Sequence, residues 1–418
     1  MKKSLFLLVV LFFVFSFNDY AQVQNDTLRE KAIKVYFDCY FCDMDFIRRE
    51  ITYVNYVRDR KEADVVILGT SMSTGSGGTE YTLTFIGYNK FNGINDTLTY
   101  DAKPDATKDE KRKGLLKILQ MGLLRYIIHS PYADKLELSM KDENVENNAE
   151  DKEVIDKWKN WVFRIGASGW FNGEATSRNI SGNGYINADK VTKSIKINTK
   201  LEVSYNENKY SYGDFNYLTI IRNMGYRSLV VFSLGEHWSA GGSVSAGTNT
   251  YNNKEMYASI SPGIEYDVFK YSEATHHQLR LLYKIGYDYN KYIDTTIYNK
   301  IEEGYPTHQL NVAFEVVKPW GSISTTMWAV QYLHDMNFYN IGVWGYMRFR
   351  IFKGFSTYMN FSSSIIHNQI YLAKDDYSIE DLLTNSKSMP TNYSYYMSIG
   401  VSYTFGSVYN NVVNPRFD

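Results

Sequence analysis

From residue 161 onwards, apolar and polar side chains alternate with a period of two. In the clearest stretch, one parity carries Leu279, Leu281, Tyr283, Ile285 and Tyr287, and the other carries Arg280, Lys284, Gly286 and Asp288. Such alternation is typical of an extended strand whose two faces meet different surroundings. Turn signals divide residues 161–407 into about twelve segments of this kind. We therefore expect about twelve antiparallel strands in this part of the chain.

The last of these segments, Tyr395–Phe405, has small polar residues on one face and large apolar residues on the other. Within it, Ser398, Gly400, Tyr403 and Phe405 follow the order polar, glycine, aromatic, aromatic. This order resembles the C-terminal signal by which the outer-membrane assembly machinery recognises β-barrel clients. The chain continues beyond Phe405, and residues 408–418 are expected to form a periplasmic tail.

Residues 30–140 have a different pattern, which predicts a compact α+β domain of the β-α-β-β-α type. Strands are expected at Ile33–Phe37, Asp64–Thr70 and Tyr81–Tyr88, the last two joined by the glycine-rich loop 73–78. Apolar residues at helical spacing predict helices over Asp45–Val57 and Asp105–Ile128. The charged stretch 141–160 has few apolar residues to bury and is interpreted as a linker.

The N-terminus has the composition of a secretory signal peptide. Basic residues at Lys2 and Lys3 precede the apolar run Leu5–Phe17, and the small residue Ala21 marks an expected cleavage site after residues 1–21. The apolar run is too short to cross a bilayer as a helix, which needs roughly 20 residues. If the mature chain spans a membrane, it must do so as a closed β-barrel, because only helices and barrels satisfy every backbone group in lipid.

Connection lengths predict which way such a barrel points. Short connections are expected at Asp189–Lys193, Gly235–His237, Ser272–Thr275, Trp320–Gly321 and Lys353–Gly354. Longer ones are expected at Phe171–Ser177, Glu207–Asp214, Tyr292–Thr307 and Lys374–Thr391, the last being the one candidate to fold inward. Short turns face the periplasm in outer-membrane barrels. The N-terminal domain and the tail are therefore expected in the periplasm.

Composition supports a membrane location and excludes nucleic acid as a partner. The 37 Tyr and 23 Phe suit the aromatic girdles of a membrane barrel, and the net charge of −1 offers no electrostatic case for nucleic acid. With these features the chain is expected to be an all-β membrane protein: a transmembrane barrel at 161–407 behind a periplasmic domain.

Charged residues of one parity are expected to line the barrel interior. They are Arg164, Lys196, Lys200, Glu202, Glu265, Asp267, Arg280, Lys284, Asp288, Glu315, Arg348 and Arg350. Both signs occur in comparable number, so we expect cross-bore pairing. Such a network either fills a narrow barrel or lines a small pore.

Cys39 and Cys42 form a Cys-x-x-Cys sequence between a predicted strand and a predicted helix. A thioredoxin-like redox pair occupies such a position, but the βαβ context that should follow is missing. Zinc would need two further ligands. The favoured interpretation is a disulfide without a catalytic role, and no cofactor is expected.

Seven histidines offer little support for catalysis. The His334–Asp335 pair lies near the outer end of a predicted strand, yet adjacent strand residues point to opposite faces. No catalytic or metal-binding residues are assigned.

The segments Val54–Arg60 and Thr74–Gly78, with the signal peptide and the barrel pattern, resemble predicted outer-membrane β-barrel proteins of Gram-negative envelopes that carry an N-terminal periplasmic α/β domain. The resemblance implies a location in the cell outer membrane but no particular activity. Our leading hypothesis is a non-enzymatic barrel whose periplasmic domain binds a protein or a cell-wall polymer. The alternatives are a narrow channel for small solutes and an outer-membrane hydrolase. Outer-membrane lipid and the barrel assembly machinery are the expected partners.

Overall fold

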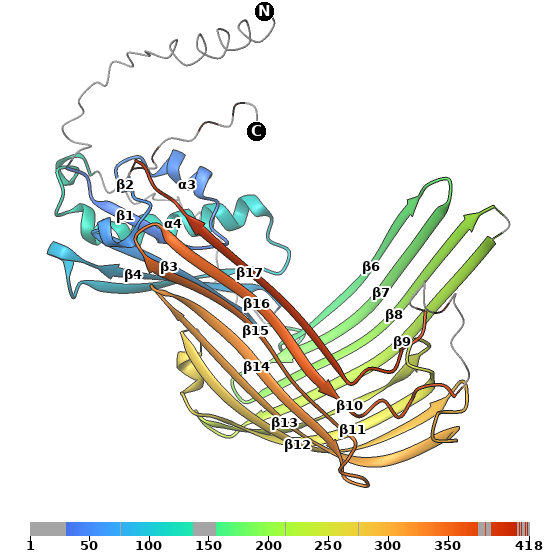
Figure 1. The fold of residues 1–418 in the computed structure, drawn as a ribbon. Coiled ribbons are helices and arrows are strands. Elements are labelled where there is room, and N and C mark those ends of the chain that lie inside the picture. Colours follow the sequence, from blue (N-terminus) through green and yellow to red (C-terminus); the bar gives the residue numbers. More distant parts are fainter. Residues whose placement is uncertain are drawn as a thin grey trace, which may run out of the picture.

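The computed structural model describes residues 31–75, 77–136, 156–213, 215–274, 276–374, 386–407 and positions 381, 409, 411, 414 and 416. The predicted signal peptide 1–21, most of the predicted linker 141–160 and much of the tail 408–418 lie outside these residues. Two sheets make up the structure, one in the N-terminal domain and one formed by the rest of the chain (Figure 1).

The N-terminal domain has a mixed five-stranded sheet in the order β2-β1-β3-β4-β5. The strands are β1 Lys34–Asp38, β2 Asn55–Tyr56, β3 Val65–Ser73, β4 Thr79–Gly87 and β5 Asn95–Ala102. The helices are α3 Met44–Glu50 and α4 Lys108–Ile127, with 3₁₀ turns η1 Arg60–Glu62, η2 Asn89–Phe91 and η3 Ala133–Lys135. Strands β2 and β3 run parallel to β1, whereas β3, β4 and β5 form an antiparallel meander.

One face of this sheet forms the core of the domain. Helix α4 begins with a capping box between Thr107 and Glu110 and buries Leu119 and Leu123 completely. Phe85 of β4 packs so closely on α4 that a Cβ at Gly122 would lie 2.1 Å from its ring, so only glycine fits there. The opposite face, with Tyr36, Leu68 and Thr70, is left for other contacts.

The domain contains more strand than its sequence pattern predicts. Strand β5 was not expected, because Asn95–Ala102 alternates polar residues with few apolar ones. Helix α3 ends at Glu50 rather than at Val57, because Asn55–Tyr56 pairs with β1 as strand β2.

The second sheet has 12 antiparallel strands in chain order from β6 to β17. The first six are β6 Trp161–Gly173, β7 Ser177–Val191, β8 Ile195–Tyr212, β9 Phe215–Ser233, β10 Trp238–Asn249 and β11 Lys254–Asp267. The others are β12 His277–Tyr292, β13 Glu302–Lys318, β14 Gly321–Tyr332, β15 Tyr339–Phe352, β16 Phe355–Ile366 and β17 Tyr393–Tyr403, with the 3₁₀ turn η4 Tyr271–Glu273 before β12. The prediction of about twelve antiparallel strands is confirmed.

The predicted closure of the barrel is not seen. Within the described residues, β6 and β17 each pair with one neighbour only, and the sheet is a deeply curved trough open between them (Figure 1). Both edges are short, since β6 and β17 have 13 and 11 residues against 18 and 19 in β8 and β9.

Connection lengths agree with the expectation only in part. Four of the five connections expected to be short are tight, whereas the fifth, between β11 and β12, spans residues 268–276 and includes η4. All five lie at one end of the sheet, which we call the inner mouth. At the other end, the connections after β6 and β8 are also tight. Strand β6 continues to Gly173 and β8 to Tyr212, so each extends into the loop that was expected to follow it. The long connections there follow β12 and β16. The N-terminal domain lies at the inner mouth (Figure 1).

Candidate functional site

The two faces of the 12-stranded sheet differ in chemistry. On one face, large apolar side chains remain exposed, for example Ile260 at 55%, Ile285 at 52% and Val401 at 67%. We call this the outer face. The opposite parity forms the inner face, where Ser259 and Lys284 help to line a common cavity. An ordinary water-soluble sheet buries its apolar face. In this sheet the apolar face is exposed and the polar face lines the trough.

Ion pairs lie along the inner face near the first strands. Arg164 of β6 contacts Asp189 of β7, with 2.5 Å between Nη2 and Oδ2. Glu202 of β8 holds two cations, the ammonium of Lys200 on its own strand and, at 3.6 Å, Nη2 of Arg227 on β9. Neighbouring strands thus neutralise these charges locally rather than across an open bore.

The central strands continue the network. Arg280 of β12 lies 3.9 Å from Glu265 of β11. Asp267 is completely buried and accepts hydrogen bonds from the backbone N–H groups of Phe269 and Leu279, so it holds the β11–β12 connection in place. Here a predicted interior charge has a structural role.

Lys284 and Asp288 line a cavity of about 260 Å³ on the inner face. The other lining residues are mostly small or polar: Arg227, Ser243, Ser245, Ser259, Ser261, Gly286, Thr307, Gln309 and Val330. Four serine hydroxyls and three charged side chains, two of them cationic, make this wall hydrophilic without filling it. The space is suited to water and small polar solutes.

The remaining predicted charges lie nearer the inner mouth. Glu315 accepts a hydrogen bond of 2.6 Å from Gln278. Lys196 is exposed at the start of β8, and Arg348 is exposed on β15. Arg350 pairs with the N-terminal domain.

At the outer end, the β16–β17 connection folds across the trough to the opposite loops. The Ile297 N–H donates to the Leu372 carbonyl at 2.9 Å, and the Lys374 N–H donates to the Thr295 carbonyl at 2.8 Å. Further along, the Ser388 N–H donates to the Tyr251 carbonyl. The segment expected to be able to fold inward, Lys374–Thr391, therefore begins and ends in contact with the β10–β11 and β12–β13 loops.

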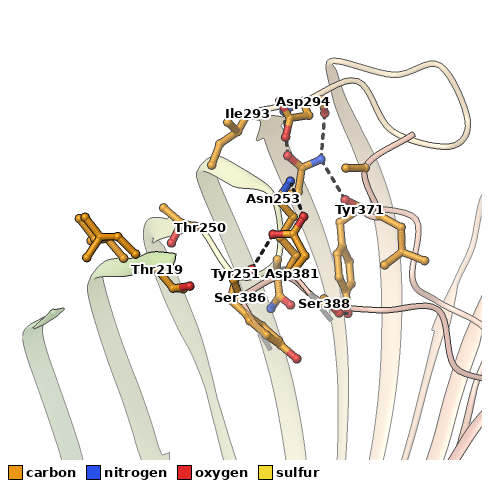
Figure 2. A pocket seen from close by; sticks show the side chains of 16 residues that line it. Thr219, Thr250, Tyr251, Asn253, Ile293, Asp294, Tyr371, Asp381, Ser386 and Ser388 are labelled. Atoms are coloured by element: carbon orange, nitrogen blue, oxygen red, sulfur yellow. Dashed lines mark hydrogen bonds and ion pairs between the residues drawn. The ribbon is translucent and has the colours of Figure 1, made fainter. Parts of the chain in front are cut away.

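These loops surround a cavity of about 400 Å³ (Figure 2). Asn253 is central to its wall, because its amide donates to the carbonyls of Asp294 and Tyr371 at 2.8 and 3.1 Å. Asn253 has φ 54°, a left-handed conformation that asparagine tolerates better than most residues. One side chain thus joins three loops at the outer rim.

The N-terminal domain is fixed to the inner mouth by charged contacts with β15 and the β15–β16 turn. Nη1 and Nη2 of Arg350 both donate to the Asp38 carboxylate, at 2.5 and 2.6 Å. Next to this pair, Lys353 contacts Glu62, and the hydrogen bond raises the pKa of the Lys353 ammonium. The Arg350 guanidinium also lies 5.2 Å from the centre of the Tyr36 ring, and burial raises the pKa of this phenol.

Backbone groups strengthen this contact. The Gly354 N–H donates to the Asp59 carboxylate at 2.8 Å. Beyond β17, Tyr409 forms an isolated bridge with Val57, and the Asn411 amide oxygen accepts from the Tyr56 N–H at 2.7 Å.

On the opposite side of the mouth, the tip of the β3–β4 hairpin reaches the first strands. A Cβ added to Gly75 would lie 2.6 Å from the Val191 carbonyl oxygen at the end of β7. A Cβ on Gly77 would lie 2.9 Å from Nη1 of Arg164 on β6. The hairpin therefore crosses the mouth, and glycine is required where its backbone meets the wall.

Cys39 and Cys42 are joined by a disulfide between β1 and α3. It follows Asp38 directly and precedes Asp43, whose carboxylate accepts from the Phe46 N–H and so caps α3. The disulfide therefore closes the loop that directly follows the carboxylate bound to Arg350.

The predicted assembly-signal residues lie at the end of β17. Ser398, Gly400 and Tyr403 belong to the strand, and Phe405 follows it with 77% of its surface exposed. A Cβ at Gly400 would lie 2.1 Å from the Tyr358 ring of β16, which packs over the glycine.

Several site residues were not singled out from the sequence. Asp189 and Arg227 lie at strand positions of the inward-facing parity, so applying the same alternation to every charged residue would have identified them. Asp38, Asp59 and Glu62 had no such signal, because their importance depends on contacts with distant turns.

The chain matches no family model, and no curated protein matches it. Among solved structures, it is similar to the NanC porin in a rhombohedral crystal form. The identity is 9%, the match covers 58% of this chain and 99% of the porin, and the TM-score is 0.27. At this TM-score the likeness carries no argument for function.

Two further observations concern the described segments alone. None of their helices has the length and hydrophobicity needed to span a bilayer. They also contain no group of three or more His, Cys, Asp or Glu side chains placed to hold a metal ion.

Proposed function

We propose that the protein is an integral outer-membrane β-barrel that acts as a narrow channel for small polar solutes, with the N-terminal domain covering its inner mouth. The observation that carries this proposal is the inverted sheet. Its outer face exposes a band of large apolar side chains, while its inner face holds ion pairs, serine hydroxyls and cavities. Lipid outside and water inside satisfy both faces.

In the membrane, β6 and β17 pair with each other to close the barrel. The two strands run in opposite directions, as antiparallel pairing requires, and an even number of strands suits a single-chain barrel. Closure is favoured because unpaired strand edges cost several kcal/mol per backbone group in hydrocarbon.

The position of the N-terminal domain supports a cover rather than a free adaptor. Two loop tips of the domain, around Tyr40 and Thr74–Gly78, face the barrel wall. Tyr40 helps to line a cavity shared with β13, β14 and β15, and Gly75 meets Val191.

A second candidate, binding of a periplasmic partner, is favoured by strand β5. Among the described residues it pairs with β4 alone and so forms an edge of the domain sheet, and Thr97 and Thr99 are exposed along it. An extended peptide can add to such an edge by main-chain hydrogen bonds. Under this proposal the domain would be both cover and receptor.

Solute flux in liposomes tests the channel. The full chain is expected to pass small polar solutes slowly, and a chain lacking residues 30–140 is expected to pass them faster. Absence of flux from both, when both migrate as folded and heat-modifiable species, would exclude the channel. Turnover of lipid or peptide by the pure protein would instead favour the hydrolase.

The membrane location has its own test. The protein is expected to migrate differently before and after boiling and to resist carbonate extraction. Identical migration by a carbonate-extractable chain would contradict the proposal.

A further inference from the structure

A chamber of about 550 Å³ lies between the N-terminal domain and the barrel wall. The domain contributes the segment Leu68–Met72 of β3 together with Asp38 and Tyr40. The barrel contributes the ends of β13, β14 and β15, including Ser322, Ser324 and Tyr346. We call this space the interface chamber.

Charges around the interface chamber are unevenly partnered. Its three cations are Lys318, Arg348 and Arg350, and its two carboxylates are Asp38 and Glu315. Asp38 is occupied by Arg350, and Glu315 accepts from the neutral amide of Gln278. Neither Lys318 nor Arg348 forms an ion pair or side-chain hydrogen bond with any described residue. The chamber therefore offers unpaired positive charge.

Arg348 is the better placed of the two cations to recognise a ligand. It lies opposite Ser322 on β14 and Tyr358 on β16 in the strand register, so a hydroxyl-bearing residue flanks it on each side. Its planar guanidinium can bind an oxyanion through two parallel hydrogen bonds.

The domain side of the chamber adds a further polar group. Thr70 is only 8% exposed, and its hydroxyl oxygen finds no hydrogen-bond partner among the described residues. Buried hydroxyls are nearly always partnered in proteins, so an unpartnered one that lines a cavity points to a missing ligand or solvent molecule. Thr70 and Arg348 thus approach the same space from opposite walls.

We propose that the interface chamber binds a small solute bearing an oxyanion, a carboxylate or a phosphate, with Arg348 as its main contact. Ser322, Ser324 and Thr70 complete the site through their hydroxyls. The site deepens the proposed channel by giving it a preference for anionic solutes. It forms only while the domain covers the mouth, because one wall belongs to β3.

Calorimetric titration of the folded full chain in detergent tests the site, with inorganic phosphate and gluconate as probes. We expect at least one probe to bind, and Arg348→Gln to weaken that binding about tenfold or more. Arg348→Lys should restore part of the affinity, because it keeps the charge but loses the planar fork. The matched control is Arg178→Gln, whose guanidinium pairs with Glu207 at the outer end of the sheet and should leave affinity unchanged.

The probes and the flux assay separate the possible failures. Binding of phosphate alone or gluconate alone identifies the oxyanion. Binding without flux supports the site and contradicts the channel. The proposal is overturned if neither probe binds, or if Arg348→Gln, with unaltered heat-modifiable migration, binds as tightly as the wild type.

Discussion

Replacing Asp38 by Asn should loosen the N-terminal domain from the barrel. The substitution keeps the shape of the side chain but removes the charge that Nη1 and Nη2 of Arg350 contact. The two side chains are 21% and 19% exposed, so the pair is neither a surface pair nor fully buried. Exposed pairs contribute about 0–1 kcal/mol, and breaking fully buried ones costs about 3–5 kcal/mol. We therefore expect a loss of about 2 kcal/mol.

That loss corresponds to a roughly 30-fold increase in the undocked population, since 1.4 kcal/mol is a factor of ten. The Gly354 amide is a direct reporter, because it donates to Asp59 of the domain only while the two are in contact. Hydrogen exchange of this amide in detergent micelles should accelerate by a similar factor. A double-mutant cycle with Arg350→Gln should assign most of the effect to the pair.

The matched control is Asp109→Asn, which breaks exposed ion pairs with Arg112 and Lys113 on α4, away from the mouth. It should leave exchange at Gly354 unchanged. If Asp38→Asn changes that exchange by less than about threefold, the ion pair does not hold the domain and the magnitude argument above is wrong.

Three further predictions follow from the mouth, the outer face and the disulfide. Gly75→Val should undock the hairpin, because its side chain would meet a backbone carbonyl, and flux through liposomes should rise. Ile285→Arg should destabilise the folded protein by about 2–4 kcal/mol in lipid, measured by urea unfolding in vesicles, because it places a charge on the outer face, which lipid covers in the barrel that we propose. Replacing Cys39 and Cys42 by Ser should leave heat-modifiable migration intact. The wild type should have no insulin-reducing activity that depends on these cysteines.

Each of these has a control or a contrary outcome. Gly182→Val is the control for the hairpin, since a Cβ at Gly182 meets nothing within 4 Å. Ser259→Arg is the control for the outer face, because it places the same charge on the inner face; equal costs at the two positions would contradict the assignment of faces. Insulin reduction that disappears with the cysteines would show a redox role.

The strands and faces of the large sheet were predictable because alternation is a local signal. The run Leu279–Asp288 shows its parity without knowledge of any neighbour. Strand β5 was missed because the parity that packs towards the core carries Asp96 beside Leu98 and Tyr100, so the alternation of polar and apolar residues has little contrast. The end of β8 was missed for a related reason, since Glu207–Tyr212 extends past the apolar band into polar surroundings.

The site at the mouth was not predictable from local pattern. Asp38 and Arg350 lie 312 positions apart, and each looks like an ordinary charge in its own segment. Parity placed Arg350 on the inner face correctly but could not supply its partner. The unpaired state of Arg348 is visible only after the contacts of all its neighbours are known.

The span of the N-terminal domain across the mouth has a consequence for how the protein is assembled. On one side its hairpin meets Arg164 and Val191, which belong to the first strands of the sheet. On the other it holds Arg350 and Lys353 beside the last strands. In the closed barrel that we propose, a domain in contact with both ends of the sheet would raise their effective concentration for pairing. A chain without it should still pair neighbouring strands but join its first strand to its last more slowly.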